Sequence, residues 1–84
     1  MYKIVISNTA LKEINNLSDK MFIRVNNAIN SLKDEPRPKG CKKLLNIVGY
    51  RIRVGDFRIL YRIKDEELEI LVFKVGLRKD VYRN

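Results

Sequence analysis

The chain contains no histidine and no tryptophan, and it has a single cysteine, Cys41. Histidine is the commonest general base and the commonest metal ligand in proteins, so its absence argues against most metal sites and most acid–base mechanisms. One cysteine cannot form an internal disulfide, and nothing else in the composition indicates secretion. We therefore expect no metal and no cofactor, and we interpret Cys41 as a loop or strand-edge residue. Any catalysis must use arginine, lysine, tyrosine or carboxylate groups.

Long apolar segments are also missing from the 84 residues. No stretch approaches the roughly 20 apolar residues that a membrane-spanning helix needs. The first residues, MYKIVISNTALKEI, mix charges with strand-forming residues and do not resemble a signal peptide. The sequence has no repeats, low-complexity segments or linkers, so we expect one domain over residues 1–84 and a cytoplasmic location.

Positive charge is abundant and unevenly distributed. The net charge is +8 and the sequence pI is about 9.9. Residues 37–62 contain eight basic side chains and one acidic side chain, whereas residues 63–84 contain five of each. Nearly all of the excess therefore lies in one stretch of the chain, which indicates a basic patch and a polyanionic partner.

The first half of the chain has the spacing of one strand followed by two helices. β-branched residues predict a strand at residues 2–6, and Ser7, Asn8, Thr9 and Ser18-Asp19 are suitable N-terminal caps. We expect helices at Ala10–Leu17 and from Ser18 to about Lys33, and the prolines and glycine of residues 34–40 end the second one. The apolar positions expected to face the core are Leu11, Ile14 and Leu17, and then Phe22, Val25, Ile29 and Leu32.

The second half is typical of an antiparallel sheet. Expected strands are Leu44–Val48 and Tyr50–Val54 (separate or continuous), Phe57–Ile63 and Leu68–Val75. Gly55-Asp56 suits a type II′ turn, and Asp65–Glu67 marks the next turn. The last strand is apolar on both faces, so we expect it in the centre of the sheet. The sequence predicts an α+β fold, with two N-terminal helices packed on one face of an antiparallel sheet of about four strands.

The predicted hairpin concentrates arginines on one face. Counting outward from Gly55-Asp56 places Arg53 opposite Arg58 and Arg51 opposite Leu60. Ile52, Ile59, Tyr50 and Tyr61 then share the face beneath the helices, and the opposite face carries Arg51, Arg53, Arg58, Leu60 and Arg62. Like charges opposite each other destabilise a sheet, and a phosphate that accepts paired N–H bonds explains why they are tolerated. The alternative is a solvated strand face whose arginines spread over apolar surface.

The stretch GYRIRVGDFRILYRI, a short acidic turn and LVFKVGLRKDVYRN together resemble the RelE/ParE toxin superfamily, and most closely its RelE-like mRNA interferases. The resemblance covers nearly the whole chain, and the early ALKEI helix and the proline-containing loop also match. It implies a β-α-α-β-β-β fold and a toxin of a type II toxin–antitoxin system. It also implies a ribosome-dependent endoribonuclease, held inactive in a hetero-oligomer by a RelB-like antitoxin with an acidic segment.

The resemblance also implies the site. Catalytic positions carried over from the family are Arg51, Arg53, Arg58, Arg78 and Tyr82. Expected RNA-binding residues around them are Lys42, Lys43, Arg62, Lys79 and Arg83, with solvated charge as the alternative for Lys79 and Arg83. This chain departs from the family pattern in two ways, because Leu77 stands where many relatives have histidine and arginines replace a pair of lysines.

The implied reaction is attack of a ribose 2′-OH on its own phosphate. Arginines suit charge neutralisation, but their pKa above about 12 makes them poor bases, so Tyr82 is the one conventional candidate base among the matched positions. Two other functions stay open from the sequence. The first is a ParE-like inhibitor of DNA gyrase without nuclease activity, and the second is a non-catalytic basic RNA-binding module.

Overall fold

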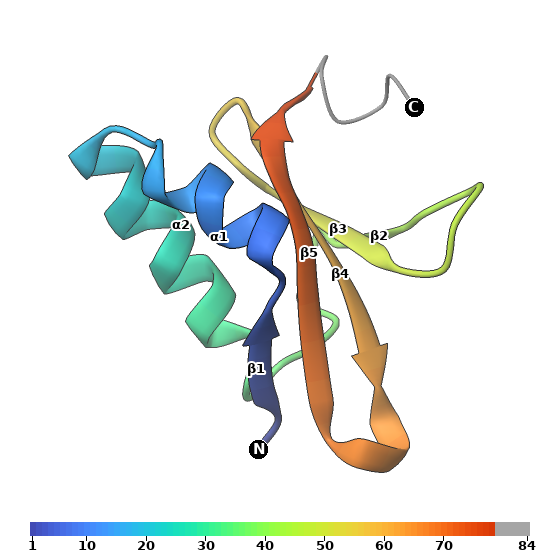
Figure 1. The fold of residues 1–84 in the computed structure, drawn as a ribbon. Coiled ribbons are helices and arrows are strands. Elements are labelled where there is room, and N and C mark those ends of the chain that lie inside the picture. The colour runs from blue at the N-terminus through green and yellow to red at the C-terminus, as the bar shows by residue number, and fades with distance from the viewer. Residues whose placement is uncertain (79–84) are drawn as a thin grey trace.

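The computed structural model describes residues 1–78 (Figure 1). Its elements in chain order are β1 (Lys3–Ile6), α1 (Asn8–Asn15), α2 (Asp19–Ser31), β2 (Lys42–Lys43), β3 (Tyr50–Val54), β4 (Phe57–Lys64), a 3-10 turn (Asp65–Glu67) and β5 (Glu69–Leu77). Both helices lie on one side of the sheet, as the sequence predicted. No helix within these residues is both long and apolar enough to cross a membrane.

The sheet has five strands in the order β1-β5-β4-β3-β2, one more than expected. The predicted central position of the last strand is confirmed, because β5 lies between β1 and β4. The β1–β5 pair is parallel, with Ile4 opposite Ile70, whereas the other pairs are antiparallel. The predicted fold class is therefore confirmed, with a sheet that is antiparallel except at this edge.

The two helices begin at the serine caps that the sequence indicated. The Ser7 hydroxyl accepts a hydrogen bond from the backbone N–H of Ala10 at 3.1 Å, and the Ser18 hydroxyl accepts one from that of Met21 at 3.3 Å. These bonds satisfy backbone donors that have no partner inside the helix. The first helix has the predicted length but lies two residues earlier, at Asn8–Asn15, and the second helix is shorter than predicted because it ends at Ser31.

The buried stripe of each helix starts one position away from the predicted one. Leu11 and Phe22 were expected in the core, but they are 46% and 40% exposed. Ala10 is fully buried instead, and Met21 packs against the core. Residues four apart share a helix face, so the true stripes run from Ala10 to Ile14 and from Met21 through residues 25 and 29.

The segment Leu44–Val48 was a candidate strand and is a loop. The backbone N–H of Leu44 donates to the carbonyl of Gly49 at 2.9 Å, which closes the loop, and Leu45 is 98% exposed. Gly49 has a φ of 145°, and a Cβ there would lie 2.8 Å from the backbone oxygen of Tyr61. Only glycine permits this close approach. Gly49 ends the loop, and β3 begins at the next residue, Tyr50.

The core lies between the helices and the sheet. Its fully buried members on the strands include Ile59, Tyr61, Ile70 and Val72, and the helices contribute Ala10, Ile14, Val25 and Ile29. Tyr61 and Ile59 face the helices, which confirms the inner face that the hairpin pattern predicted.

A carboxylate protects the edge of β5 beyond the end of β1. The last β1–β5 pair is Ile6 with Val72, so the following residues of β5 have no strand on that side. There, Glu13 of α1 accepts a hydrogen bond from the backbone N–H of Val75 at 2.9 Å and pairs with the Lys74 ammonium at 2.6 Å. The helix thus satisfies an edge donor that would otherwise need water.

Candidate functional site

The β3–β4 hairpin has the register that the sequence predicted. Arg53 lies opposite Arg58, and Arg51 lies opposite Leu60. Gly55 has a φ of 59° and is the first of the two turn residues, as a type II′ turn requires. We call the side of this hairpin that faces away from the helices the arginine face; it consists of Arg51, Arg53, Arg58, Leu60 and Arg62.

Arg58 is the unusual member of the arginine face. Its side chain is only 3% exposed, and its Nε has no hydrogen-bond partner among the described residues. Opposite it on β5 stands Gly76, which has no side chain. A buried donor without a partner costs about 1 to 3 kcal/mol, and arginine cannot relieve this by losing its charge. The fold therefore holds a fixed, poorly compensated cation, which is a favourable place for an anion.

A basic groove runs beside Arg53. It encloses about 430 Å³ between the loop that follows α2 and the strand β3. Its lining consists of Pro38, Lys39, Gly40, Lys42, Arg51, Ile52 and Arg53. Four cations in this lining, Lys39, Lys42, Arg51 and Arg53, form a surface suited to a chain of phosphates.

The other predicted residues separate into two groups. Lys42 stands opposite Arg51 and so joins the arginine face, whereas Lys43 stands opposite Tyr50 on the helix side of the sheet. Lys43 lines a different hollow, with Arg37 and the loop at 44–49. The guanidinium carbon of Arg62 lies 6.0 Å above the ring of Phe73, an arrangement that permits a cation–π contact.

Arg78 stands at the turn end of the arginine face. Its backbone N–H donates to the carbonyl of Asp56 at 3.0 Å, which fastens the end of β5 to the hairpin turn. Lys79, Tyr82 and Arg83 lie outside the described residues.

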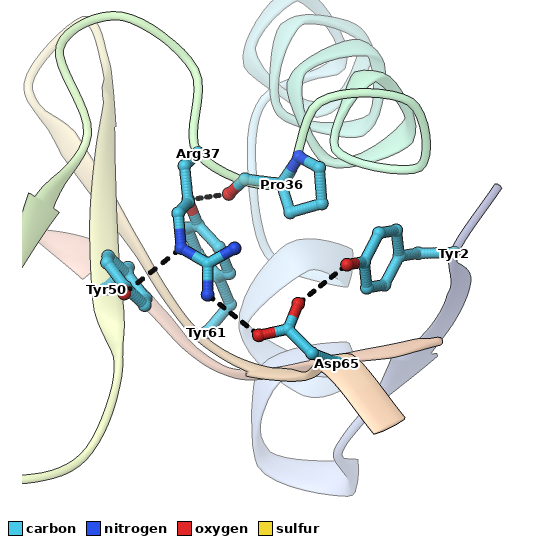
Figure 2. A network of polar contacts seen from close by, with 6 residues as sticks. All are labelled: Tyr2, Pro36, Arg37, Tyr50, Tyr61 and Asp65. Carbon is cyan, nitrogen blue, oxygen red and sulfur yellow. Dashed lines mark hydrogen bonds and ion pairs between the residues drawn. The ribbon is translucent and has the colours of Figure 1, made fainter. Parts of the chain in front are cut away.

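Figure 2 shows a polar network that the sequence did not reveal, centred on Arg37 and Asp65. The Arg37 Nε donates to the Tyr50 hydroxyl at 3.2 Å, and Arg37 Nη2 pairs with Asp65 Oδ2 at 3.0 Å. Tyr2 donates its hydroxyl to the other oxygen of Asp65 at 2.6 Å, and Tyr61 donates to the carbonyl of Pro36 at 2.7 Å.

The pKa shifts of this network follow from its bonds. The Arg37 guanidinium and then the Tyr2 hydroxyl stabilise the charged form of Asp65, so the pKa of this carboxyl lies below its ordinary value. Burial is the main cause that raises the pKa of the Tyr61 phenol. The hydrogen bond to Asp65 is the main cause that raises the pKa of Tyr2. All three groups therefore keep one charge state near neutral pH, with Asp65 ionised and both phenols neutral.

Two helices on one face of a sheet, and clustered arginines on the other, define a small basic α+β protein that offers fixed donors to a polyanion. A family model described as the ParE toxin of type II toxin–antitoxin systems matches residues 4–82. Toxin RelG of Mycobacterium tuberculosis is 30% identical over 84 residues, which cover 98% of this chain and 97% of RelG.

Solved structures agree with these sequence matches. The toxin–antitoxin complex RelBE2 of Mycobacterium tuberculosis contains a chain with a TM-score of 0.80 and 28% identity, covering 92% of this chain and 98% of its own. The isolated RelE toxin of E. coli gives a TM-score of 0.80 and 25% identity, covering 98% of this chain and 92% of RelE. The chain belongs to the ParE toxin family of type II toxin–antitoxin systems, and its relatives are RelE toxins.

Proposed function

We propose that this toxin is a metal-independent endoribonuclease that cuts messenger RNA on the ribosome in the cytoplasm. The observation that carries the proposal is the buried, unpartnered Nε of Arg58 directly opposite Arg53. Two cationic side chains at directly opposed positions of a hairpin repel each other, and an anion bound beside them would offset this repulsion. A phosphate group accepts paired N–H hydrogen bonds from arginine, and phosphate is the repeating anionic group of the RNA backbone.

The proposed reaction is an intramolecular transesterification of the RNA phosphodiester. The 2′-oxygen attacks the adjacent phosphorus, the bond from phosphorus to the 5′-oxygen breaks, and the 2′-OH proton is lost while the leaving oxygen gains one. The products are a 2′,3′-cyclic phosphate and a 5′-hydroxyl. Arg53 and Arg58 neutralise the charge that develops on the phosphorane, with Arg51 beside them, and Arg78 at the turn end stabilises the leaving oxygen.

Proton transfer is the part that arginines perform poorly. Their pKa, above about 12, leaves almost no neutral form to accept the 2′-OH proton. In the proposal Tyr82 is the candidate base, and most of the rate comes from positioning and charge neutralisation rather than from acid–base catalysis. The ribosome holds the message in a fixed geometry, which makes such a mechanism sufficient.

The basic groove extends the proposed RNA site beyond the cleaved phosphate. Its volume of about 430 Å³ is lined by Lys39 of the loop, Lys42 of β2, and Arg51 and Arg53 of β3. Contacts between such cations and flanking phosphates release counterions, so RNA binding should weaken steeply as salt rises. Arg62, Lys79 and Arg83 complete the proposed set, and Lys43 points to the other side of the sheet.

We also propose that a RelB-like antitoxin inhibits this toxin through an acidic segment. Seven of the eight net charges fall in residues 37–62, and an acidic partner would gain both affinity and inhibition by covering them. The RelBE2 toxin of Mycobacterium tuberculosis was solved together with its antitoxin. A hetero-oligomer of this chain with its own antitoxin is therefore part of the proposal.

Expression of the chain alone tests the proposed function. Growth should stop, and primer extension on total RNA should show new 5′ ends within translated messages, whereas the same RNA incubated with toxin but no ribosomes should stay intact. The variant Arg58→Met should allow growth, and the matched variant Lys12→Met, which removes one exposed charge from α1, should remain toxic. Loss of plasmid supercoiling with intact transcripts would contradict the proposal and favour gyrase inhibition.

A further inference from the structure

Arg37 makes two side-chain hydrogen bonds within the protein although it lies at the surface. Its Nε bonds to Tyr50, its Nη2 pairs with Asp65, and its guanidinium carbon lies 5.3 Å from the centre of the Tyr50 ring. Figure 2 shows the side chain between these two partners. Two of its five N–H donors bind groups of the protein, so this side chain joins separate parts of the fold.

These contacts join three segments that are distant in sequence. Arg37 belongs to the loop after α2, Tyr50 is the first residue of β3, and Asp65 begins the turn between β4 and β5. A second link holds the same loop, because Tyr61 of β4 donates to the carbonyl of Pro36 and its ring stacks on Tyr50 with a centroid distance of 6.0 Å. The start of the loop is thereby fixed against both strands of the hairpin.

Both walls of the basic groove continue from this junction. The loop wall, Pro38 to Gly40, begins one residue after Arg37, and Lys42 of β2 follows it. The strand wall begins with Arg51, one residue after Tyr50. The bond from Arg37 to Tyr50 therefore joins the two walls at one end, and the pairing of Lys42 with Arg51 joins β2 to β3 at the other.

We propose that Arg37 is a positioning residue, which holds the loop so that Lys39 stays beside Arg51 and Arg53 in the lining of the groove. This inference rests on the proposed function, since RNA is the ligand that the groove would hold. Releasing the loop gives Lys39 more freedom, and binding must then order this side chain again. The cleaved phosphate lies at Arg53 and Arg58, which are on the hairpin and keep their places. Loss of Arg37 should therefore weaken RNA binding more than it slows cleavage of bound RNA.

The single cysteine supplies a direct probe of the loop. Cys41 is half-buried, packs against the core, and donates its backbone N–H to the carbonyl of Pro38 at 3.0 Å. Its rate of reaction with a disulfide reagent such as DTNB reports how often the loop leaves its place. In Arg37→Met this rate should rise about 5-fold or more, while the melting temperature shows that the chain stays folded.

Three full-length variants separate positioning from charge. Arg37→Met and Lys39→Met each remove one positive charge. Only Arg37→Met removes the bonds to Tyr50 and Asp65, so only this variant should increase the reactivity of Cys41. Asp65→Ala removes a negative charge, and simple electrostatics predicts that it binds RNA more tightly. Positioning predicts the opposite, because Asp65→Ala also frees Arg37.

The measurements are Cys41 reactivity, anisotropy of a labelled single-stranded RNA, and single-turnover cleavage on programmed ribosomes. For Arg37→Met and Asp65→Ala we expect faster Cys41 reaction, a Kd and KM raised about 5-fold to 10-fold, and kcat within about 2-fold of the parent.

Two results would overturn the role of Arg37: weaker RNA binding with unchanged Cys41 reactivity, or tighter binding by Asp65→Ala. A parent chain that neither binds nor cuts RNA would instead refute the proposed function, so the parent's own activity distinguishes the two failures.

Discussion

Replacing Arg58 with methionine should make this protein more stable. The unpartnered Nε costs about 1 to 3 kcal/mol in the folded state, and repulsion from Arg53 adds a fraction of a kcal/mol. Methionine keeps an unbranched stem of similar length and fills irregular space well. The volume of the lost guanidinium offsets part of the gain, by up to about 1 kcal/mol. We expect a net increase of about 1 kcal/mol in the free energy of unfolding.

For a domain of this size, about 1 kcal/mol corresponds to a rise of roughly 4 to 8 °C in Tm. Thermal unfolding followed by circular dichroism measures it, with Lys12→Met as the matched control. Both variants lower the net charge from +8 to +7, so any general relief of charge repulsion is the same in both. The control should shift Tm little, because Lys12 is exposed.

A fall of several degrees in the Tm of Arg58→Met, with the control unchanged, would refute this reasoning. Arg58 would then stabilise the fold, and its burial would have a structural purpose. A stable but inactive variant would instead show the compromise that functional sites often make, in which a residue is kept for its chemistry at the expense of stability.

Three further predictions concern the partner, the sheet edge and pH. Binding of the co-encoded antitoxin should weaken as salt rises and should weaken further in Arg53→Glu, and an affinity measured by calorimetry that responds to neither would exclude an acidic segment on this face. Glu13→Ala should lower the free energy of unfolding by about 1 to 3 kcal/mol, because the N–H of Val75 loses its acceptor, and an unchanged Tm would show that water replaces the carboxylate. Arg37 depresses the pKa of Asp65, so the stabilising effect of the Asp65 carboxylate is present above its unfolded pKa and is lost as the pH falls through its folded pKa. The Tm difference between the parent and Asp65→Ala should therefore disappear in acid. A Tm difference that persists there would contradict the ion pair.

The hairpin shows how far local sequence rules reach in this protein. A two-residue turn that begins with glycine fixes the register, and the alternation of residues then assigns each side chain to a face. Both predictions were confirmed at Arg53 opposite Arg58 and at Tyr61 beneath the helices. The same rules do not predict how far a side chain is exposed to solvent. They therefore did not indicate that Arg58 is buried while Arg53 on the same face is exposed.

The errors arise where tertiary contacts decide the structure. Phe22 and Met21 are both apolar, and the periodicity alone could not tell which of them begins the buried stripe. The loop at 44–49 has strand-like composition, but a closing hydrogen bond from Leu44 and the close approach of Gly49 to β4 determine its shape. Arg37 bonds to Tyr50, 13 positions away, and to Asp65, 28 positions away. Local sequence patterns do not predict contacts between residues this far apart in the chain.

The central claim is that the arginine face binds and stabilises the phosphate that is cut. Single-turnover cleavage of messenger RNA on programmed ribosomes, with saturating toxin, tests it most directly in the parent, Arg58→Met and Lys12→Met. We predict that Arg58→Met cuts about 10²-fold more slowly or worse, because a fixed donor to the transition state is lost, while Lys12→Met cuts at the parental rate. Parental cleavage by a correctly folded Arg58→Met would contradict the account.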